Sequence, residues 1–328
     1  MNRSTRLTFQ LLAGWIAVLS GVSEAQVLRV ADLNAQQIGA LDRSRTAVIL
    51  PGGILEEHGP YLPSFSDGYL NEWVTRRIAE AIVARPEWAA LVFPSIPLGN
   101  SGANDLGERY SFPGTYTVRF ETLRTIYMDL ADELGGQGFQ WIFLVHLHGA
   151  PNHSRALDQA GDYFHDTYGG WMVHLAGLSS VMSAITAPKS PTQSAEDGFA
   201  IHAGMDETSW MLFLRPDLVD PGFREARAVS ASSMEGLVPL AKAPGWPGYL
   251  GSPRLATAAH GATVVDGVAA HAVSTVMSVL DGADPRTLER FATAMEKSAA
   301  DVALDAASRR AEAERAQKQR EWIERHGR

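Results

Sequence analysis

Apolar and polar residues alternate along the chain in blocks that predict strands and helices in turn. Leu70, Val74, Ile78 and Ile82 recur at helical spacing and predict a helix that starts at Asp67 and runs to about residue 86. Similar spacing predicts helices at 34–41, 120–134, 152–168, 203–214, 265–280 and 286–325. Short, compact apolar runs predict buried strands at 46–50, 90–96, 141–145 and 171–175.

This alternation of strands and helices predicts an α/β fold. We expect a three-layer sandwich, in which a mostly parallel central sheet is covered by helices on both faces. Ligands of such sheets bind at the carboxyl ends of the strands. Loops rich in glycine, proline and polar residues are predicted at 97–117, 181–200 and 216–249, and the first is long enough to suggest a functional loop.

Composition limits the domain number and the classes of partner. With 328 residues, 45% of them hydrophobic, residues 26–328 fit a single domain with a long, charged C-terminal helix. The net charge of -9 argues against a nucleic-acid-binding protein and favours a small-molecule substrate. The chain has no cysteine, so any metal must be bound by histidine, aspartate or glutamate.

The N-terminal residues have the pattern of a secretory signal peptide. Arg3 and Arg6 precede a short apolar segment, and small residues stand at Ser23 and Ala25. We therefore expect residues 1–25 to be removed and the mature protein to be periplasmic or secreted. A retained N-terminal anchor is the alternative. No other stretch is predicted to cross a bilayer, so no membrane contact is expected after cleavage.

The candidate chemistry is concentrated directly after the first predicted strand. Glu56, Glu57 and His58 follow Pro51-Gly52-Gly53, and Asp67 comes after a second short loop. Buried carboxylates must be paired or bound to a metal, and a divalent cation meets that need. The alternative is that the glutamates are solvated and that Asp67 caps the following helix.

The order of four motifs resembles the creatininase (creatinine amidohydrolase) family of metal-dependent hydrolases. The segment from Glu56 to Asp67 reads E-x-H-G-P-x-L-P-x-x-x-D, and the other three are FPGT at 112–115, HGAPN at 148–152 and HAGMDETS at 202–209. The resemblance implies a hydrolase that uses a metal-activated water to cleave a carbon–nitrogen bond, other than a peptide bond, in a small cyclic or linear amide. It also implies a homo-oligomer, namely a hexamer.

The same resemblance assigns the metal ligands. Glu56, His58, Asp67 and His148 align with family ligands, and Asp67 would bridge two ions. Carboxylates and imidazoles suit Zn²⁺, Mn²⁺ or Fe²⁺. Creatininase itself has a further carboxylate ligand two residues after the histidine that aligns with His148, whereas this chain has Ala150. That difference argues against creatinine as the substrate, and we predict that Glu207 replaces the missing ligand.

Further site residues are assigned by alignment. His202 aligns with a family histidine near the substrate and is the predicted proton donor to the leaving nitrogen, with Glu207 as a second catalytic candidate. Glu57, Tyr61 and Arg109 are predicted to bind the substrate, although Tyr61 and Arg109 each replace a histidine that is usual in the family. For Arg109, a salt bridge to Glu108 or Asp105 is an equal alternative.

Two other functions remain open from the sequence. One is a lactonase or small-peptide hydrolase that uses the same site. The other is a non-catalytic periplasmic binding protein with a degenerate site, for which Ala150 and Tyr61 are the evidence. The sequence contains no G-x-S-x-G nucleophile motif, no Walker loop and no dinucleotide-binding glycine motif.

Overall fold

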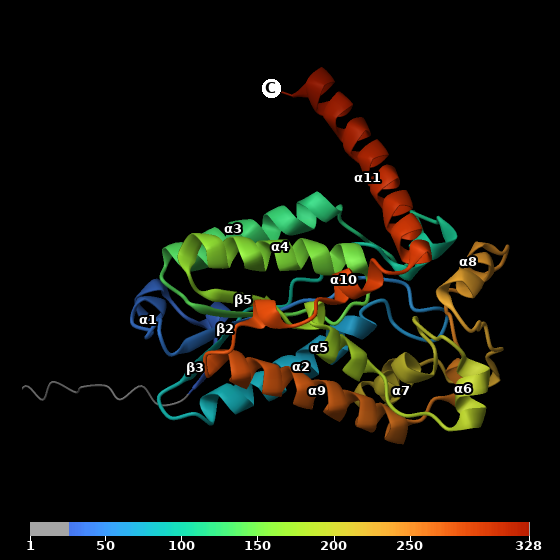
Figure 1. The fold of residues 1–328 in the computed structure, drawn as a ribbon, viewed down its shortest axis with the longest axis horizontal. Helices are drawn as coiled ribbons and strands as arrows, with labels where there is room; N and C mark the ends of the chain where they lie inside the picture. Colours follow the sequence, from blue (N-terminus) through green and yellow to red (C-terminus); the bar gives the residue numbers. More distant parts are fainter. Residues whose placement is uncertain (1–25, 328) are drawn as a thin grey trace, which may run out of the picture.

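A five-stranded parallel sheet forms the centre of the protein in a computed structural model that describes residues 26–327 (Figure 1). The strand order is β1-β3-β2-β4-β5, and every neighbouring pair is parallel. The strands are β1 (Val27–Arg29), β2 (Thr46–Pro51), β3 (Ala89–Val92), β4 (Trp141–Val145) and β5 (Trp171–His174). Four of them confirm the predicted strands, while the edge strand β1 was not predicted.

Helices cover both faces of the sheet, as the sequence predicted. Helices α3 (Phe120–Gly136) and α4 (Pro151–Tyr168) lie on one face, and α2 (Ser66–Val83) and α9 (Ala258–Leu280) lie on the other (Figure 1). Side chains of β2 alternate between these two layers: Val48 and Leu50 belong to the core under α3 and α4, and Ala47 and Ile49 to the core under α2 and α9. The three-layer α/β sandwich is therefore confirmed.

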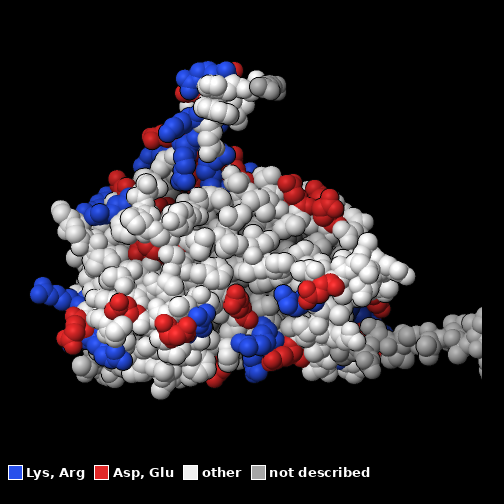
Figure 2. All heavy atoms as spheres, turned by 180° about the vertical axis from the view of Figure 1, so that it is seen from behind, with Lys and Arg blue, Asp and Glu red and all other residues white. Residues whose placement is uncertain are grey.

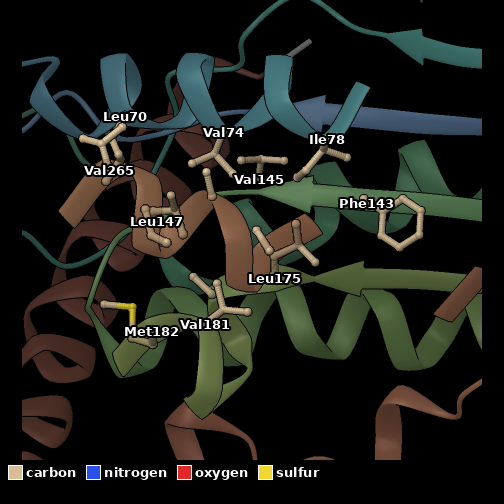
Figure 3. Close-up of a cluster of buried hydrophobic side chains, with 14 of the residues drawn as sticks. Leu70, Val74, Ile78, Phe143, Val145, Leu147, Leu175, Val181, Met182 and Val265 are labelled. Carbon is tan, nitrogen blue, oxygen red and sulfur yellow. The ribbon is translucent and has the colours of Figure 1, made fainter. Parts of the chain in front are cut away.

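The larger core has α2 at its centre. Leu70, Val74 and Ile78 are fully buried and project from one face of α2 toward Val145 at the end of β4 (Figure 3). The same cluster includes Val265 of α9. Because α2 begins with Ser66 and Asp67, this packing also fixes the position of the Asp67 carboxylate.

Helix α9 is longer and more apolar than its predicted range of 265–280. Over residues Ala258–Leu280 it is long and apolar enough to cross a membrane, which corrects the expectation that no such stretch exists. In this structure it packs against α2 and against α7 (Met205–Leu214). Its earlier start follows from Thr257, whose side chain accepts the His260 N–H as an N-cap.

Two predicted loops contain helices that periodicity did not indicate. Segment 181–200 holds α6 (Pro191–Asp197), which starts with a capping box on Ser190, and the short α5 (Ser179–Met182) overlaps the start of the segment. Segment 216–249 holds α8 (Met234–Lys242), capped by Ser233 and carrying Pro239 inside the helix. The small α1 (Ala35–Gly39) agrees with the prediction at 34–41.

The C-terminal helix is shorter than predicted. Instead of one helix over 286–325, the chain forms α10 (Phe291–Met295) and α11 (Ala299–His326), separated at Ser298, which caps α11. One end of α11 lies on the body and the rest projects away from it (Figure 1). Basic and acidic side chains lie together on this projecting helix and are also mixed over the visible body (Figure 2). The predicted signal peptide at 1–25 lies outside the described residues.

Candidate metal centre

The carboxyl ends of β2 and β4 bring the candidate residues together. After β2 the chain passes through Gly52, and a Cβ atom there would lie 1.8 Å from Nε2 of His146, which follows β4. Only glycine permits this close approach, which allows the two strand ends to lie side by side. The next residues of the two segments, Glu56 to His58 and His148, therefore meet in one buried cluster.

Asp67 lies at the centre of this cluster and faces a histidine with each carboxylate oxygen. Its Oδ1 atom is 3.3 Å from His58 Nε2, and its Oδ2 atom is 3.1 Å from His148 Nδ1. The side chain is almost completely buried in the first turn of α2. A carboxylate with one oxygen toward each of two nitrogen ligands has the arrangement expected of a bridging ligand.

Glu56 and His148 complete one group of donors with Asp67. Nδ1 of His148 lies 3.3 Å from Glu56 Oε2, and the three side chains together can hold a metal ion. The other His148 nitrogen, Nε2, donates to the carbonyl of Ser101 at 2.9 Å. Nδ1 is therefore the nitrogen that faces the carboxylates, and it would bind a metal through its lone pair once it has lost its proton.

His58 forms the second half of the cluster. Its Nδ1–H donates to the Glu56 carbonyl at 3.0 Å, which leaves Nε2 directed at the carboxylates. Besides Asp67, Nε2 faces Glu207 Oε2 at 3.4 Å. The predicted replacement ligand is therefore placed beside His58, where its Oε2 atom also accepts the Ala203 N–H at 2.8 Å.

His202, the predicted proton donor, lies beside the candidate metal ligands. Glu56, His58 and His202 form a second group that can hold an ion, and the rings of the two histidines lie 4.5 Å apart. His202 Nε2 donates to the Glu57 carbonyl at 2.7 Å, so Nδ1 is the free nitrogen. Nδ1 lies 3.8 Å from Glu56 Oε1 and 4.0 Å from Glu207 Oε2.

The cluster carries an excess of negative charge. Among the ion pairs of the described residues, the partners of Glu56, Asp67 and Glu207 are all histidines. Although burial opposes the charged imidazole, the neighbouring carboxylates raise the pKa of His148 to about 9 and that of His58 well above its usual value. Groups that attract protons so strongly also attract metal cations.

Burial and histidine contacts shift the pKa values of Glu207 and Asp67 in opposite directions. Burial raises the pKa of Glu207, and His58 only partly opposes that effect. For Asp67, burial works against ionisation, but hydrogen bonds from His148 and His58 bring the pKa well below its usual range. Asp67 is therefore the permanent anion between the two donor groups.

The donor spacing fits a metal site. Donors bound to a tetrahedral ion at 2.0–2.1 Å lie about 3.3 Å from one another. The contacts of Asp67 and Glu56 with His148 measure 3.1 and 3.3 Å, and those of Asp67 and Glu207 with His58 measure 3.3 and 3.4 Å. The residues present therefore fit ions of the class that imidazole and carboxylate ligands select.

Comparison with known proteins identifies the family. The family model for creatininase, described as creatinine amidohydrolase, matches residues 31–276. The chain belongs to the creatininase family. The predicted enzyme class, a hydrolase that acts on carbon–nitrogen bonds, is thereby confirmed.

Two curated relatives and two solved structures illustrate the similarity. Creatinine amidohydrolase of Pseudomonas putida is 30% identical over 53% of this chain and 66% of that protein. A mycofactocin precursor peptide peptidase of Mycobacterium ulcerans is 26% identical over 77% of this chain and 93% of that protein. Creatininase structures in a manganese form and a Zn-Zn form each align at 22% identity with a TM-score of 0.56, over 78% of this chain and 99% of theirs.

The three predicted substrate-binding residues differ in their surroundings. Glu57 is buried next to His202, and its Oε1 atom has no hydrogen-bond partner among the described residues. Tyr61 packs against Tyr249, with the ring centres 6.0 Å apart. Arg109 donates to the Ala243 carbonyl at 2.7 Å, just beyond α8, rather than to Glu108 or Asp105. Their substrate roles remain predictions, and Glu57 is the best placed of the three.

Sequence reasoning missed the backbone groups that complete the centre. The Ser101 carbonyl accepts from His148, and the Ala103 N–H donates to Glu56 Oε1. Ser101 adopts a φ of 58°, and Ala203, next to His202, a φ of 47°. Such left-handed residues other than glycine often mark functional sites. The only signal in the sequence was the unusual length of the 97–117 loop.

Proposed function

We propose that this protein is an exported, metal-dependent amidohydrolase that cleaves a carbon–nitrogen bond in a small cyclic or linear amide. The observation that carries the proposal is the position of Asp67 between His58 and His148, with one carboxylate oxygen directed at each. We propose two divalent ions per chain, Zn²⁺, Mn²⁺ or Fe²⁺, which supply Lewis acidity and an activated water when bound.

The side chains of the cluster divide into two ion sites and a proton donor. Glu56, Asp67 and His148 would hold one ion. His58, whose Nε2 atom faces Asp67 at 3.3 Å and Glu207 at 3.4 Å, would hold the other together with those two carboxylates. His202 keeps its Nε2–H on the Glu57 carbonyl and presents Nδ1 to the reaction space. Although burial opposes the charged ring, the Glu56 and Glu57 carboxylates raise the pKa of His202 to about 9, so Nδ1 carries a proton that it would give to the leaving nitrogen.

Glu57 and the buried surroundings select the substrate. The Glu57 Oε1 atom, which lies 3.4 Å from His202 Nε2 and has no hydrogen-bond partner among the described residues, would accept a hydrogen bond from an N–H of the amide. Ala150, in place of the carboxylate of creatininase, argues for a substrate other than creatinine.

A second candidate activity is the hydrolysis of a small peptide. It is favoured by the mycofactocin precursor peptide peptidase relatives, whose alignment covers 93% of the Mycobacterium ulcerans protein. The ligand set would be the same, and the difference would lie in the segments that cover the site. A lactone is a third substrate class to test alongside these two.

Localisation and assembly are further parts of the proposal. The basic, apolar and small-residue pattern over 1–25 supports export to the periplasm or the medium. A homo-oligomer, by resemblance a hexamer, is expected for the mature chain.

The test combines metal content with activity on the mature protein, residues 26–328. We expect about two ions per chain by elemental analysis, in line with a two-metal site, and turnover of a member of a panel of cyclic amides, linear amides, short peptides and lactones. A chelator should abolish that turnover, and added Zn²⁺ or Mn²⁺ should restore it. His58→Ala should lose both metal and activity.

The same experiment can refute the proposal. A protein that binds no metal after reconstitution and turns over nothing in the panel would be a binding protein with a degenerate site. Turnover that is undisturbed in His58→Ala would equally contradict a metal mechanism centred on this cluster.

A further inference from the structure

Helix α11 lies outside the part of the chain that defines the family, yet it contacts the segments around the metal centre. The family match ends at residue 276, and α11 spans Ala299–His326. The part of α11 that lies against the body extends to Ala316, with Ser308 and Ala316 buried, whereas every residue from 317 to 327 is exposed (Figure 1). The contacts of this part are therefore the ones that matter for the site.

One set of contacts reaches the 97–117 loop. Glu312 accepts a hydrogen bond from the Asn100 side-chain amide through Oε1 and one from the Phe120 N–H through Oε2, the latter at 3.0 Å. Ser308 Oγ donates to Asp105 Oδ2 at 2.9 Å. The carboxylate of Glu312 thus joins the start of the loop to the start of α3.

A second set of contacts reaches the start of α4. Arg309 Nε donates to Asn152 Oδ1 at 3.1 Å, and Arg155 lies 3.4 Å from Asp305. Asn152 and Arg155 follow His148 closely in the sequence, because α4 begins at Pro151. Helix α11 therefore contacts both segments next to His148: the 97–117 loop, which faces this histidine, and α4, which follows it in the chain.

The loop segment bears directly on His148. His148 Nε2 donates to the carbonyls of Ser101 at 2.9 Å and Asn100 at 3.3 Å. A ligating histidine is oriented by such a bond from its other nitrogen, and loss of that partner typically weakens metal binding. The Asn100 backbone N–H is also fixed, because it donates to His153 Nδ1 at 3.2 Å.

We propose that Glu312 is a positioning residue for the metal centre. By holding the Asn100 side chain and the Phe120 N–H, it sets the place of the Asn100 and Ser101 carbonyls, and through them the direction in which His148 presents Nδ1. This inference rests on the proposed metal function. It gives α11 a role in the site that the family fold alone does not supply.

Glu312→Gln is the decisive variant. Both partners of Glu312 are donors, so the amide nitrogen of glutamine must face one of them and break that contact while the side chain keeps its size. The matched control is Glu324→Gln, which changes the same residue type on the fully exposed part of α11. Zn²⁺ affinity is measured by competition with a chromophoric chelator. The visible absorption spectrum of the Co²⁺-substituted protein reports the geometry of the site, and urea unfolding gives the global stability.

We expect Glu312→Gln to bind Zn²⁺ about tenfold more weakly, at the low end of the 10–100-fold loss known for partners of ligands. The Co²⁺ absorption spectrum should change, and the control should match the wild type in both. In a double-mutant cycle with Asn100→Ala, the losses in affinity should be less than additive. Should Glu312→Gln fail to fold, Asn100→Ala removes the same contact from the loop side, and its Zn²⁺ affinity should fall by a similar factor.

Several results would overturn the inference. Unchanged affinity and an unchanged Co²⁺ spectrum in a folded Glu312→Gln protein would make α11 a stabilising helix only. The same conclusion follows if Zn²⁺ affinity falls only as far as the unfolded fraction rises. None of these readouts involves a substrate, so a wild-type protein that binds metal but hydrolyses nothing would refute the proposed reaction and leave the inference about Glu312 standing.

Discussion

Glu207 Oε2 lies 3.4 Å from His58 Nε2, although the two residues come from distant segments, since His58 follows β2 and Glu207 lies in the first turn of α7. This contact supports the prediction that Glu207 replaces the carboxylate that is missing at Ala150. The carboxylate that creatininase carries near its second histidine is missing from that position, and a carboxylate from a different segment is present beside His58.

The first prediction concerns the number of ions. Glu207→Gln retains the size of the side chain but removes its charge, and we expect the bound metal to fall from about two ions to about one per chain. Elemental analysis of the purified variant, after dialysis against metal-free buffer, gives the count. Glu225→Gln, an exposed change, is the matched control and should keep the wild-type content. Equal metal content in both variants would exclude Glu207 as a ligand.

The second prediction separates the two roles available to His202. It belongs to a group of residues that can hold an ion, but its Nδ1 atom is farther from the carboxylates than the nitrogens of His58 and His148 are. We therefore expect His202→Asn to retain its metal and to lose about 10²–10⁴-fold in kcat, the range for loss of a general acid. His271→Asn, on the exposed side of α9, should change neither quantity.

The measurement for His202 is a comparison of metal content with kcat on whichever amide the wild type hydrolyses. Loss of metal in step with activity would show that His202 is a ligand instead. Wild-type kcat with full metal content would remove it from the mechanism altogether.

Much of the centre could be predicted because its ligands lie in short motifs at strand ends. Glu56, His58 and His148 follow β2 and β4, and parallel strands bring their carboxyl ends to one edge of the sheet. Asp67 was placed by the helix that it starts. Local pattern and sheet geometry predict that these residues lie close together, whereas their assignment as metal ligands came from the family resemblance.

The rest depends on contacts between segments that no local pattern connects. The Asn100 and Ser101 carbonyls face His148 because of the loop's own path, and Glu312 reaches Asn100 because α11 docks there. Helix α8 escaped prediction because Pro239 lies inside it and breaks the usual helical signal. Tertiary packing decides such elements, and periodicity does not register it.

The third prediction concerns pH and Asp105. Burial raises the pKa of this aspartate from 3.8 to about 6, although the hydrogen bond from Ser308 works in the opposite direction. Between these two pH values the folded chain keeps a proton on Asp105 that the unfolded chain releases. The protonated Asp105 therefore stabilises the folded state fully below pH 3.8, and this stabilisation is lost as the pH rises through about 6. The contribution amounts to about 1–3 kcal/mol.

Asp105→Asn should remove this dependence, because asparagine stays neutral and can still accept from Ser308. The free energy of unfolding is measured in urea from pH 4 to 7. As the pH rises, the wild type should lose stability relative to the variant. Asp129→Asn, an exposed change on α3, should run parallel to the wild type. A parallel curve for Asp105→Asn as well would show that burial does not perturb this group.

The last prediction tests the close approach that assembles the centre. An alanine at Gly52 would place its Cβ atom 1.8 Å from His146 Nε2, the same nitrogen that bonds the Tyr127 hydroxyl at 2.6 Å. Because the ring is fully buried, it can move only by breaking that bond and separating the ends of β2 and β4. We expect Gly52→Ala to lose about 1–3 kcal/mol in the free energy of unfolding, as overpacked cores do.

Gly136→Ala is the matched control, since nothing lies within 4 Å of its added Cβ and the residue ends a helix. It should leave stability unchanged or raise it by about 0.5–1 kcal/mol. Both are measured by urea unfolding of metal-free protein, and Zn²⁺ affinity is then compared. Gly52→Ala should also bind Zn²⁺ more weakly, because Glu56 and His58 follow β2 while His148 follows β4. Wild-type stability and affinity in Gly52→Ala would mean that the two strand ends are free to separate without disturbing the donors.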